Sequence, residues 1–345
     1  MKVLLLSPLP PPSGGMARWT ELYIKGAADA NIKVQVVNTN ISKNRASTRT
    51  RSISVIDEVR RTWNILSVLS VEIRNFKPDL IHICSPCSRY GLLRDYLCVK
   101  KAGTIPSIFH CHCNVSDQAR TKISRFVLKK IIKKCRRILA LNSTSLQFLD
   151  SLVPGKTIYI PNFYEEENIY RSHATNEELR EIIYVGHVKL KKGIEEIYQI
   201  AKRLPEKHFT VVGPIQELPK WDKPANIVLL GEVPHEKVRK LLDESDLFLF
   251  PSHTEGFANV MLEAMAAGLP IVASDVGSNK DMVEKNGGVI TAVGDYEGMI
   301  EAICSLESCA IREKISEWNQ TKIRDEYTVS MVMRIIKEAY IGVTK

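Results

Sequence analysis

The sequence has no apolar run of the length that a membrane span needs, and the apolar run after Lys2 holds only four residues, too few for the core of a signal peptide. Its eight cysteines are scattered over 345 residues, without the dense pattern of a disulfide framework. These absences exclude a membrane-spanning protein and a small disulfide-stabilised domain. We therefore expect a cytoplasmic protein whose thiols are reduced and mostly buried.

Signatures of nucleic-acid binding are also missing, although the chain is basic. Its 48 lysines and arginines exceed its 39 aspartates and glutamates, which gives a formal charge of +9 that is concentrated in the first half. Such a charge favours a polyanion or an anionic membrane surface as partner. Because no helix-turn-helix, zinc-finger or RNA-binding motif accompanies the charge, we expect no nucleic acid among the partners.

The densest basic segment is Arg120–Arg137, which contains nine lysines and arginines. Its apolar residues recur at helical spacing: Ile123, Phe126, Val127 and Ile131. This pattern predicts a basic amphipathic helix. The helix either covers a sheet with its cations in solvent, or makes a peripheral contact with anionic lipid at the inner face of the cell membrane. The residues alone leave both interpretations open.

Both halves of the chain alternate strand-length apolar runs with helical segments. The predicted strands of the first half are Lys2–Ser7, Val34–Val37, Pro78–Ile83, Ser107–His112 and Ile138–Leu141. Those of the second half are Ile182–Gly186, Phe209–Gly213, Ile227–Leu230, Asp246–Pro251, Pro270–Ser274 and Gly288–Thr291. The alternation predicts an α/β fold with two doubly wound, Rossmann-like domains on parallel sheets.

A polar stretch near 161–175 separates the two halves. We place the first domain at 1–165, the second at 166–327, and a final amphipathic helix at 328–345. The stretch 40–52 is polar and basic, with little hydrophobic periodicity, and is predicted to be a loop.

The segment Asp246–Asp275 contains a complete strand, loop, helix and strand. Its helix is predicted to begin at Ala258 or Asn259 and to end at Gly268, with Pro270 preventing continuation. So short a crossover implies a parallel pair of strands, and ligands of parallel sheets bind beyond the carboxyl ends of the strands. The intervening loop lies at that end.

Two glutamates belong to this loop and helix. Glu255 precedes Gly256, which allows the backbone to approach a ligand closely, and the amides of the helix start favour an anion. Glu263 is one turn into the helix, from where its carboxylate can reach the same ligand and hold a ribose diol. The alternative is a surface acid in the loop and a helical acid that caps a neighbouring amide.

A wider pattern surrounds these glutamates. The sequence EGFANVMLE, with PS before it and AMAAGLPIVAS after it, resembles the signature of the family-four retaining glycosyltransferases, also called glycosyl transferases group 1. The resemblance covers nearly the whole chain and is strongest in the second half. It implies the GT-B architecture, in which two Rossmann-like domains face each other. The first domain would shape the acceptor site, the second would hold the nucleotide sugar, and the C-terminal helix would cross back to the first domain.

The resemblance also implies roles for individual residues. Glu255 and His112 would contact the transferred sugar, Lys192 would grip the donor diphosphate and Glu263 would bind the nucleotide ribose. Of these, Glu255, His112 and Lys192 are the predicted catalytic residues. The predicted donor-binding residues are Gly14, Gly15, His187, Lys192, Val233, Glu255, Gly256, Phe257, Ala258, Asn259 and Glu263.

One position departs from the family. His187 stands where the family has an arginine, and a neutral imidazole offers one hydrogen-bond donor where a guanidinium offers five. Phosphate binding is then weaker, dependent on pH, or shared with Lys189 and Lys191.

A metal site has to be weighed because Cys84 and Cys87 form C-x-x-C and the segment His110–Cys113 reads HCHC. Zinc needs ligands that converge on one point, whereas side chains alternate across a strand. We therefore expect buried thiols and no metal. His110 and His112 share one face of the predicted strand, and His112, at its carboxyl end, is the better match to the family's histidine.

These features predict a retaining glycosyltransferase that moves a sugar from a nucleotide-diphosphate sugar, expected to be UDP-linked, to a lipid-linked glycan acceptor. The expected setting is the synthesis of a bacterial surface polysaccharide such as lipopolysaccharide or capsule. Lys192 and helix-start amides would stabilise the departing diphosphate, so no metal cofactor is expected. The alternatives are a nucleotide-sugar epimerase and a sugar-nucleotide-binding protein that has lost turnover through His187.

Overall fold

The computed structural model of the protein describes residues 1–11, 14–40, 55–165 and 175–344. These residues form two compact units: the first comprises Met1–Phe163 and Val329–Lys345, and the second comprises Tyr164–Thr328. Each unit is built on one six-stranded parallel sheet, which confirms the predicted α/β class with two doubly wound sheets. Residues 41–52 of the predicted loop and most of the polar boundary stretch lie outside the described residues.

The first sheet reverses its winding direction between two neighbouring strands. Its strands are β1 (Lys2–Ser7), β2 (Lys33–Asn38), β3 (Leu80–Ser85), β4 (Ser107–Cys111), β5 (Arg137–Ala140) and β6 (Thr157–Tyr159). Their spatial order is β2-β1-β3-β4-β5-β6, and all neighbouring pairs are parallel. The reversal between β1 and β3 is the switch point of this sheet, where ligands of doubly wound folds bind.

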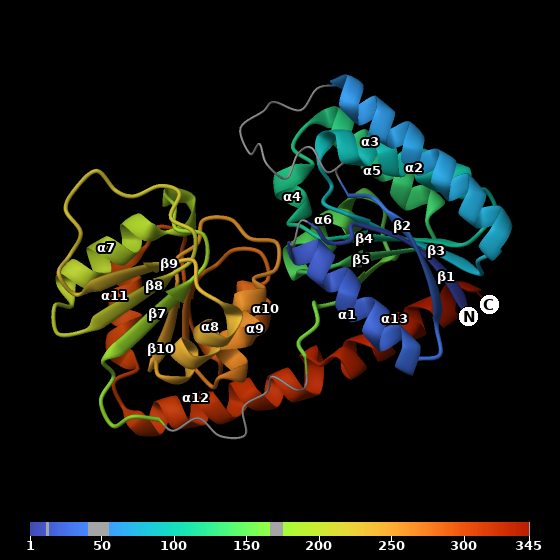
Figure 1. Ribbon diagram of the computed structural model, residues 1–345. Coiled ribbons are helices and arrows are strands. Elements are labelled where there is room, and N and C mark those ends of the chain that lie inside the picture. The colour runs from blue at the N-terminus through green and yellow to red at the C-terminus, as the bar shows by residue number, and fades with distance from the viewer. Residues whose placement is uncertain (12–13, 41–54, 166–174, 345) are drawn as a thin grey trace. The chain divides into compact units, whose positions relative to one another are not determined.

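Helices cover both faces of the first sheet (Figure 1). One face carries α2 (Val55–Phe76), α3 (Arg89–Ala102), α5 (Lys122–Lys134) and α6 (Ser143–Leu152), with the short α4 (Val115–Gln118) preceding α5, and the other face carries α1 (Gly15–Asp29) and α13 (Val329–Thr344). The alternation along β1 shows why: Leu4 and Leu6 pack beneath α2, whereas Val3 and Leu5 pack beneath α1.

The C-terminal helix α13 belongs to the first unit and lies beside α1 (Figure 1). Tyr340 of α13 and Tyr23 of α1 share a hydrogen bond of 2.8 Å between their buried hydroxyls. Gly26 allows this packing, because a Cβ at that position would lie 2.6 Å from Val329 and 2.7 Å from Met333. The sequence prediction of a returning C-terminal helix is therefore confirmed.

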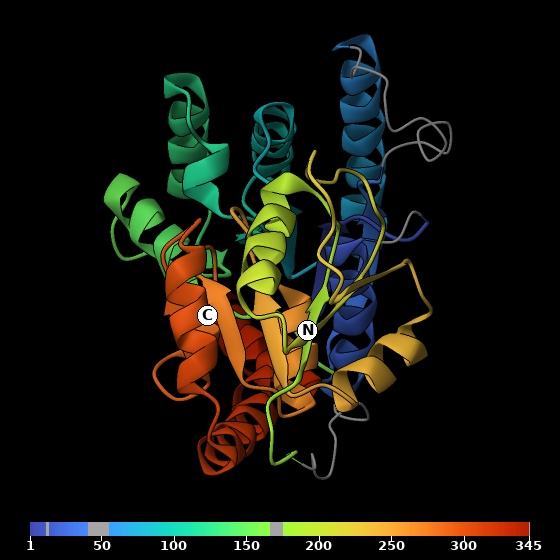
Figure 2. The same ribbon diagram turned by 90° about the vertical axis from the view of Figure 1, so that its left-hand side faces the viewer.

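The second unit repeats the architecture. Its strands are β7 (Glu181–Val185), β8 (His208–Val212), β9 (Ile227–Gly231), β10 (Leu247–Phe250), β11 (Ile271–Ser274) and β12 (Gly288–Thr291), in the order β12-β11-β10-β7-β8-β9. Its helices are α7 (Ile194–Arg203), α8 (His235–Asp243), α9 (Asn259–Ala266), α10 (Asn279–Val283), α11 (Tyr296–Ser305) and α12 (Cys309–Lys322), and a π-helical turn (Ile323–Tyr327) follows α12. Figure 2 shows this unit turned toward the viewer.

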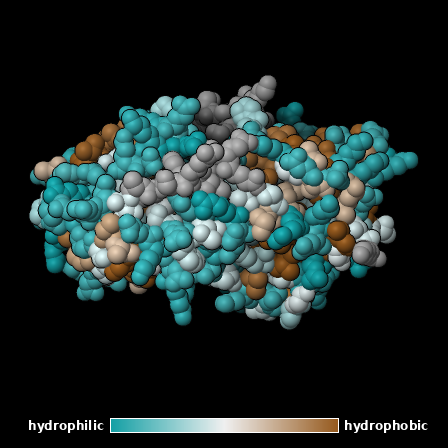
Figure 3. Space-filling view, turned by 90° about the horizontal axis from the view of Figure 1, so that it is seen from below, coloured by the Kyte–Doolittle hydropathy of each residue, from teal (hydrophilic) through white to brown (hydrophobic). Residues whose placement is uncertain are grey.

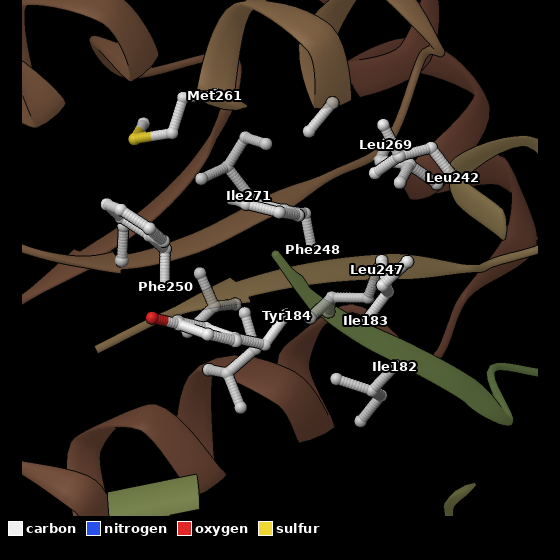
Figure 4. Packing of buried hydrophobic residues seen from close by; sticks show 14 of the residues in the cluster. Ile182, Ile183, Tyr184, Leu242, Leu247, Phe248, Phe250, Met261, Leu269 and Ile271 are labelled. Atoms are coloured by element: carbon white, nitrogen blue, oxygen red, sulfur yellow. The ribbon is translucent and has the colours of Figure 1, made fainter. Parts of the chain in front are cut away.

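The core of the second unit is centred on β7 and β10, the two strands that flank its switch point. Figure 4 shows Tyr184 of β7 near Phe248 and Phe250 of β10, and the Tyr184 and Phe250 rings stack with centroids 6.0 Å apart. The strands β10 and β11 are buried along their whole length. They are therefore rigid supports for the loops that leave their carboxyl ends.

The basic segment forms α5, but only part of its apolar set is buried. Val127 and Ile131 are buried against the sheet, whereas Ile123 and Phe126 remain 64% and 61% exposed. The predicted basic amphipathic helix is therefore confirmed, but only part of its apolar set packs on the sheet. The face of the molecule in Figure 3 is mainly hydrophilic, with hydrophobic residues in small separate groups. Among the described residues, no helix combines the length and the hydropathy that crossing a membrane requires.

Candidate active site

The site in the second unit is built at the switch point between β7 and β10. Chain order runs from β7 toward β9 in one direction and from β10 toward β12 in the other. The loops that follow β7 and β10 leave the sheet at its carboxyl edge, on either side of this reversal. They carry His187 and Glu255, and Lys192 belongs to a 3₁₀ turn, Leu190–Lys192, directly before α7.

An ion pair joins the two loops. Lys192 Nζ contacts Glu255 Oε1 and also donates a hydrogen bond of 2.9 Å to the carbonyl oxygen of Thr254. Ser252 Oγ donates a hydrogen bond of 2.9 Å to the same carboxylate oxygen. The side chains of Lys192 and Glu255 are only 18% and 14% exposed, so water screens their interaction weakly. The structure thus brings together two of the three residues predicted to be catalytic.

Gly193 determines how closely the turn Leu190–Lys192 approaches the loop after β10. Its φ of +84° is in the left-handed region, and a Cβ there would lie 2.2 Å from the carbonyl oxygen of Pro251. Only glycine fits both conditions. Gly193 also occupies the N-cap position of α7, without a side-chain cap. The backbone contact therefore fixes where Lys192 meets Glu255.

A third loop supports the glutamate from the other side. Gly277, after β11, has a φ of +56°, and a Cβ there would lie 2.5 Å from the carbonyl oxygen of Glu255 and 2.8 Å from that of Gly256. The helix α9 then starts after Ala258, whose side chain offers no cap acceptor. The polarity of a helix start favours an anion at such a position.

His187 lies at the end of β7 in a defined tautomer. The side-chain amide nitrogen of Gln216 donates to His187 Nδ1 at 3.1 Å, so the neutral ring carries its proton on Nε2. The hydroxyl of Tyr184 donates to the carbonyl oxygen of His187 at 3.0 Å. Burial, and next the charge of Glu255, raise the pKa of that hydroxyl, which keeps it a donor. His187 therefore offers one donor where the resembled family has the fork of an arginine.

Glu263 and Val233 lie near the start of α8. Glu263 Oε1 is 3.4 Å from His235 Nε2, and its side chain is 23% exposed. Val233 is partly buried against the core of the second unit, in the turn between β9 and α8. Phe257 is half-buried, with its ring centroid 6.3 Å from that of Tyr327. The predicted donor-binding residues of this half thus gather on the carboxyl side of one sheet.

The first unit holds the remaining predicted residues at its own carboxyl edge. Gly14 is the exposed N-cap of α1, and Gly15 is the first residue of that helix, so both follow β1 at the switch point. No acidic side chain lies in the first turn of α1. His112 follows β4 and packs edge-on against Trp19, with ring centroids 4.8 Å apart. Its burial lowers its pKa to about 3, which keeps the ring neutral.

The cysteines and histidines weighed for metal binding group differently from the sequence pairs. Cys84, Cys87, Cys111 and Cys113 are all free and buried thiols, which agrees with the sequence analysis. Among the described residues, the compact donor set is instead made by Cys84, His110 and His82, and His82 lies outside both sequence motifs.

The sequence analysis missed three residues that support the Lys192–Glu255 pair. Ser252 holds Glu255, Gly277 supports its backbone, and the carbonyl of Thr254 anchors Lys192. A serine directly after a buried strand and a glycine after the next strand were the available signals. Neither residue type carries chemistry that marks it in a single sequence.

Two family models match the chain and together extend over residues 13–323. Residues 165–323 match the glycosyl transferases group 1, and residues 13–168 match glycosyltransferase family 4. The structure resembles the sucrose-phosphate synthase of Thermosynechococcus elongatus, with a TM-score of 0.79 at 16% identity, over 99% of this chain and 98% of that one. It also resembles HepE of Anabaena in complex with UDP and glucose, with a TM-score of 0.74 at 15% identity, over 99% of this chain and 100% of that one. The fold is therefore that of the GT-B glycosyltransferases.

Sequence relatives give the same result. The sulfoquinovosyl transferase SQD2 of Arabidopsis thaliana is 25% identical over 68% of this chain and 51% of its own length. TuaC of Bacillus subtilis, named as a putative teichuronic acid biosynthesis glycosyltransferase, is 23% identical over 79% and 72%. The alpha-galactosylglucosyldiacylglycerol synthase of Streptococcus pneumoniae is 28% identical over 62% and 65%. This chain spans about half the length of the first of these relatives. It belongs to the glycosyl transferases of group 1.

Proposed function

We propose that this protein is a retaining glycosyltransferase that moves a sugar from a nucleotide-diphosphate sugar, with UDP as the expected nucleotide, to a glycan acceptor. The observation that carries the proposal is the Lys192–Glu255 pair, held by Ser252 at the switch point of the second sheet. Lys192 supplies a compact positive charge for the departing diphosphate, and Glu255 supplies an acceptor for the sugar. Family membership and the UDP complex of HepE support the choice of donor.

The remaining donor contacts follow from position. The start of α9, with Gly256, Phe257, Ala258 and Asn259, provides the polar end of a helix for phosphate. Glu263 is assigned to the ribose diol, and the turn that contains Val233 is assigned to the nucleobase. His187 contributes its single Nε2 proton to the phosphates, and Lys189 and Lys191 on the same loop share that task.

The acceptor-side contacts belong to the first unit. His112 and the Gly14-Gly15 start of α1 follow β4 and β1 at the carboxyl edge of the first sheet. We assign His112 to the transferred sugar, and the glycines to the anionic donor phosphate or the acceptor. In a retaining transfer the acceptor hydroxyl attacks the sugar from the face that the diphosphate leaves. The bond from the sugar to the diphosphate breaks while the bond to the acceptor oxygen forms, and the hydroxyl proton passes to the leaving phosphate.

The acceptor is proposed to be a lipid-linked glycan at an anionic membrane surface. The first unit, the acceptor side, contains 29 lysines and arginines against 10 aspartates and glutamates, a net charge of +19. On α5, Lys129, Lys130, Lys133 and Lys134 are exposed beside the exposed Ile123 and Phe126. The start of α2 adds an exposed apolar row, with Ile56, Val59 and Trp63 exposed to 78%, 64% and 75%. Cations with interspersed apolar side chains suit the headgroup region of anionic lipid.

The test is to measure nucleoside diphosphate release with and without acceptor. Thermal shift against a panel of nucleotide sugars first identifies the donor, since a ligand that binds the folded state raises its apparent stability. The transferase is expected to release nucleoside diphosphate only when a glycan acceptor is present. Conversion of the sugar without release would indicate an epimerase. Tight donor binding with neither reaction, in the presence of a panel of lipid-linked acceptors, would indicate a binding protein.

A further inference from the structure

A cluster of metal-ligand side chains lies inside the first unit, outside the donor loops. His82 and Cys84 are two residues apart on β3 and therefore point to the same face of the sheet. His110 lies directly beside Cys84 in the β3-β4 register. One donor atom from each residue lies within 4.8 Å of the other two, and all three residues are buried. The pairing of β3 with β4 thus brings His110 close to His82 and Cys84, although the two strands are far apart in the sequence.

Three of the four ring nitrogens of this cluster lack hydrogen-bond partners among the described residues. His110, with no solvent exposure, leaves both Nδ1 and Nε2 without a partner, and His82 leaves Nε2 without one. A buried polar atom without a partner costs about 1–3 kcal/mol. Native proteins rarely leave several such atoms together, so a group that accepts their lone pairs would remove a substantial penalty.

The other ring nitrogen of His82 is already oriented. His82 Nδ1 lies 2.5 Å from the hydroxyl of Tyr340, which shares a 2.8 Å hydrogen bond with the hydroxyl of Tyr23. In protein metal sites, a ligating histidine bonds to the metal through one nitrogen while a hydrogen bond holds the other. The Tyr340 hydroxyl takes that second position here, which leaves Nε2 of His82, an atom without a hydrogen-bond partner among the described residues, for the metal.

We propose that His82, Cys84 and His110 bind one zinc ion, which links β3 to β4 in the first unit. Two imidazole nitrogens and one thiolate are ligands that zinc prefers. Binding replaces the S–H bond of Cys84 by a sulfur–zinc bond and releases the thiol proton to solvent. His112, whose ring centroid lies 4.0 Å from that of His110, is not part of this set and keeps its proposed contact with the transferred sugar. The role is structural and independent of the proposed sugar transfer.

The test is the zinc content of the full-length protein after expression with added zinc. We expect about one zinc per chain in the wild type, because a structural site with this ligand set binds tightly. Cys84→Ala and His110→Phe should contain only background zinc. Cys98→Ala is the matched control, because Cys98 is a buried cysteine in α3, packed in the core on the other face of the sheet. It should keep the wild-type zinc content.

Thermal unfolding of His110→Phe distinguishes two explanations of the cluster: a metal site, or a part of the core that binds no metal. Phenylalanine keeps an aromatic ring and removes two unpartnered polar atoms, and because it is larger than histidine, both proteins are also compared without metal, in EDTA, to measure the effect of its volume. With zinc in place, the same substitution removes a ligand and should lower the unfolding temperature by several degrees. A wild-type protein without zinc, even after titration with zinc chloride, overturns the proposal. So does a His110→Phe variant that unfolds at or above the wild-type temperature.

Discussion

The two units share one architecture but have opposite charge. The first has a net charge of +19, and the second has 19 lysines and arginines against 29 aspartates and glutamates, a net charge of −10. The anionic donor is nevertheless assigned to the acidic unit. There Lys192, packed against the loop after β10, and the start of α9 supply positive potential at one point. Under this assignment, local geometry, and not net charge, determines where the small anion binds.

In the basic unit the cations are spread over exposed helices instead. The lysines of α5 stand in solvent, with few acidic partners close by in sequence. Such a distribution creates a broad field and no single binding point, and a broad field suits an extended anionic surface. The local charge at Lys192 and the broad positive field of the first unit can therefore be perturbed separately.

Removal of Lys192 should have the largest effect on the acidic unit. Lys192→Ala deletes the charge proposed for the diphosphate and leaves Glu255 without its cation. We expect kcat/KM for the donor to fall by about a thousandfold, the range seen when one positioned transition-state contact is lost. Lys202→Ala, an exposed lysine at the end of α7, is the control and should stay near wild type. Equal activity of the two variants would remove Lys192 from the mechanism.

Disturbing the close contact between Gly193 and the Pro251 carbonyl should have the next largest effect. Gly193→Ala forces a Cβ to within 2.2 Å of the Pro251 carbonyl, in addition to the left-handed φ. Gly294→Ala has a similar φ of +78° with its nearest atom 4.0 Å away, and so isolates the conformational penalty. That penalty is about 1 kcal/mol, or roughly 2–4 °C in unfolding temperature. Gly193→Ala should lose several times more, together with donor binding. Equal shifts would mean that the close approach of the two loops does not matter.

The loops after β7 and β10 show how much of the site can be predicted from the sequence. Strand-length apolar runs and the EGFANVMLE signature were enough to predict both sheets, the loop after β10 and the positions of Glu255 and Glu263. Family resemblance also pointed to Lys192. The interaction between Lys192 and Glu255 could not be predicted, because it depends on Gly193 and Gly277, which contact the loop only after β7, β10 and β11 have aligned.

The basic unit shows where sequence reasoning fails. The helical spacing in α5 predicted one apolar stripe, but Ile123 and Phe126 face solvent because only Val127, Leu128, Ile131 and Ile132 reach the sheet. The C-x-x-C and HCHC segments led to a prediction of no metal, which stays a prediction, and among the described residues the compact donor set pairs β3 with β4 instead. The spacing of residues along the chain does not show which residues of two paired strands lie side by side.

Charge reversal on α5 tests whether the spread cations of the first unit bind an anionic surface. Changing Lys129, Lys130, Lys133 and Lys134 to glutamate should reduce sedimentation with anionic vesicles several-fold, since each cation near such a surface contributes about 1 kcal/mol. Nucleotide affinity should stay unchanged. The matched control reverses four exposed lysines of the second unit: Lys202, Lys220, Lys237 and Lys314. Equal loss in both variants would indicate a nonspecific charge effect, and no loss in either would make α5 an ordinary covering helix.

The smallest expected effect is that of a chelator. Because we assign to Lys192 the place of a divalent cation at the diphosphate, turnover should be the same when EDTA is added at the start of the assay and when magnesium or manganese is supplied. Protein-bound zinc is measured in parallel, so that an effect on the first unit is recognised. Activity abolished by EDTA and restored by magnesium would contradict the assignment.

The central claim, that Glu255 acts on the reacting sugar while Glu263 holds an unchanging part of the donor, is tested most directly by steady-state kinetics of Glu255→Gln and Glu263→Gln at saturating donor. Contacts that strengthen in the transition state act on turnover, and contacts that stay constant act on binding. Glu255→Gln should lower kcat by about a hundredfold or more with little change in nucleotide affinity. Glu263→Gln should keep kcat and raise the KM for the donor. Equal losses of kcat in both variants, or a Glu255→Gln enzyme that only binds its donor more weakly, would contradict the account.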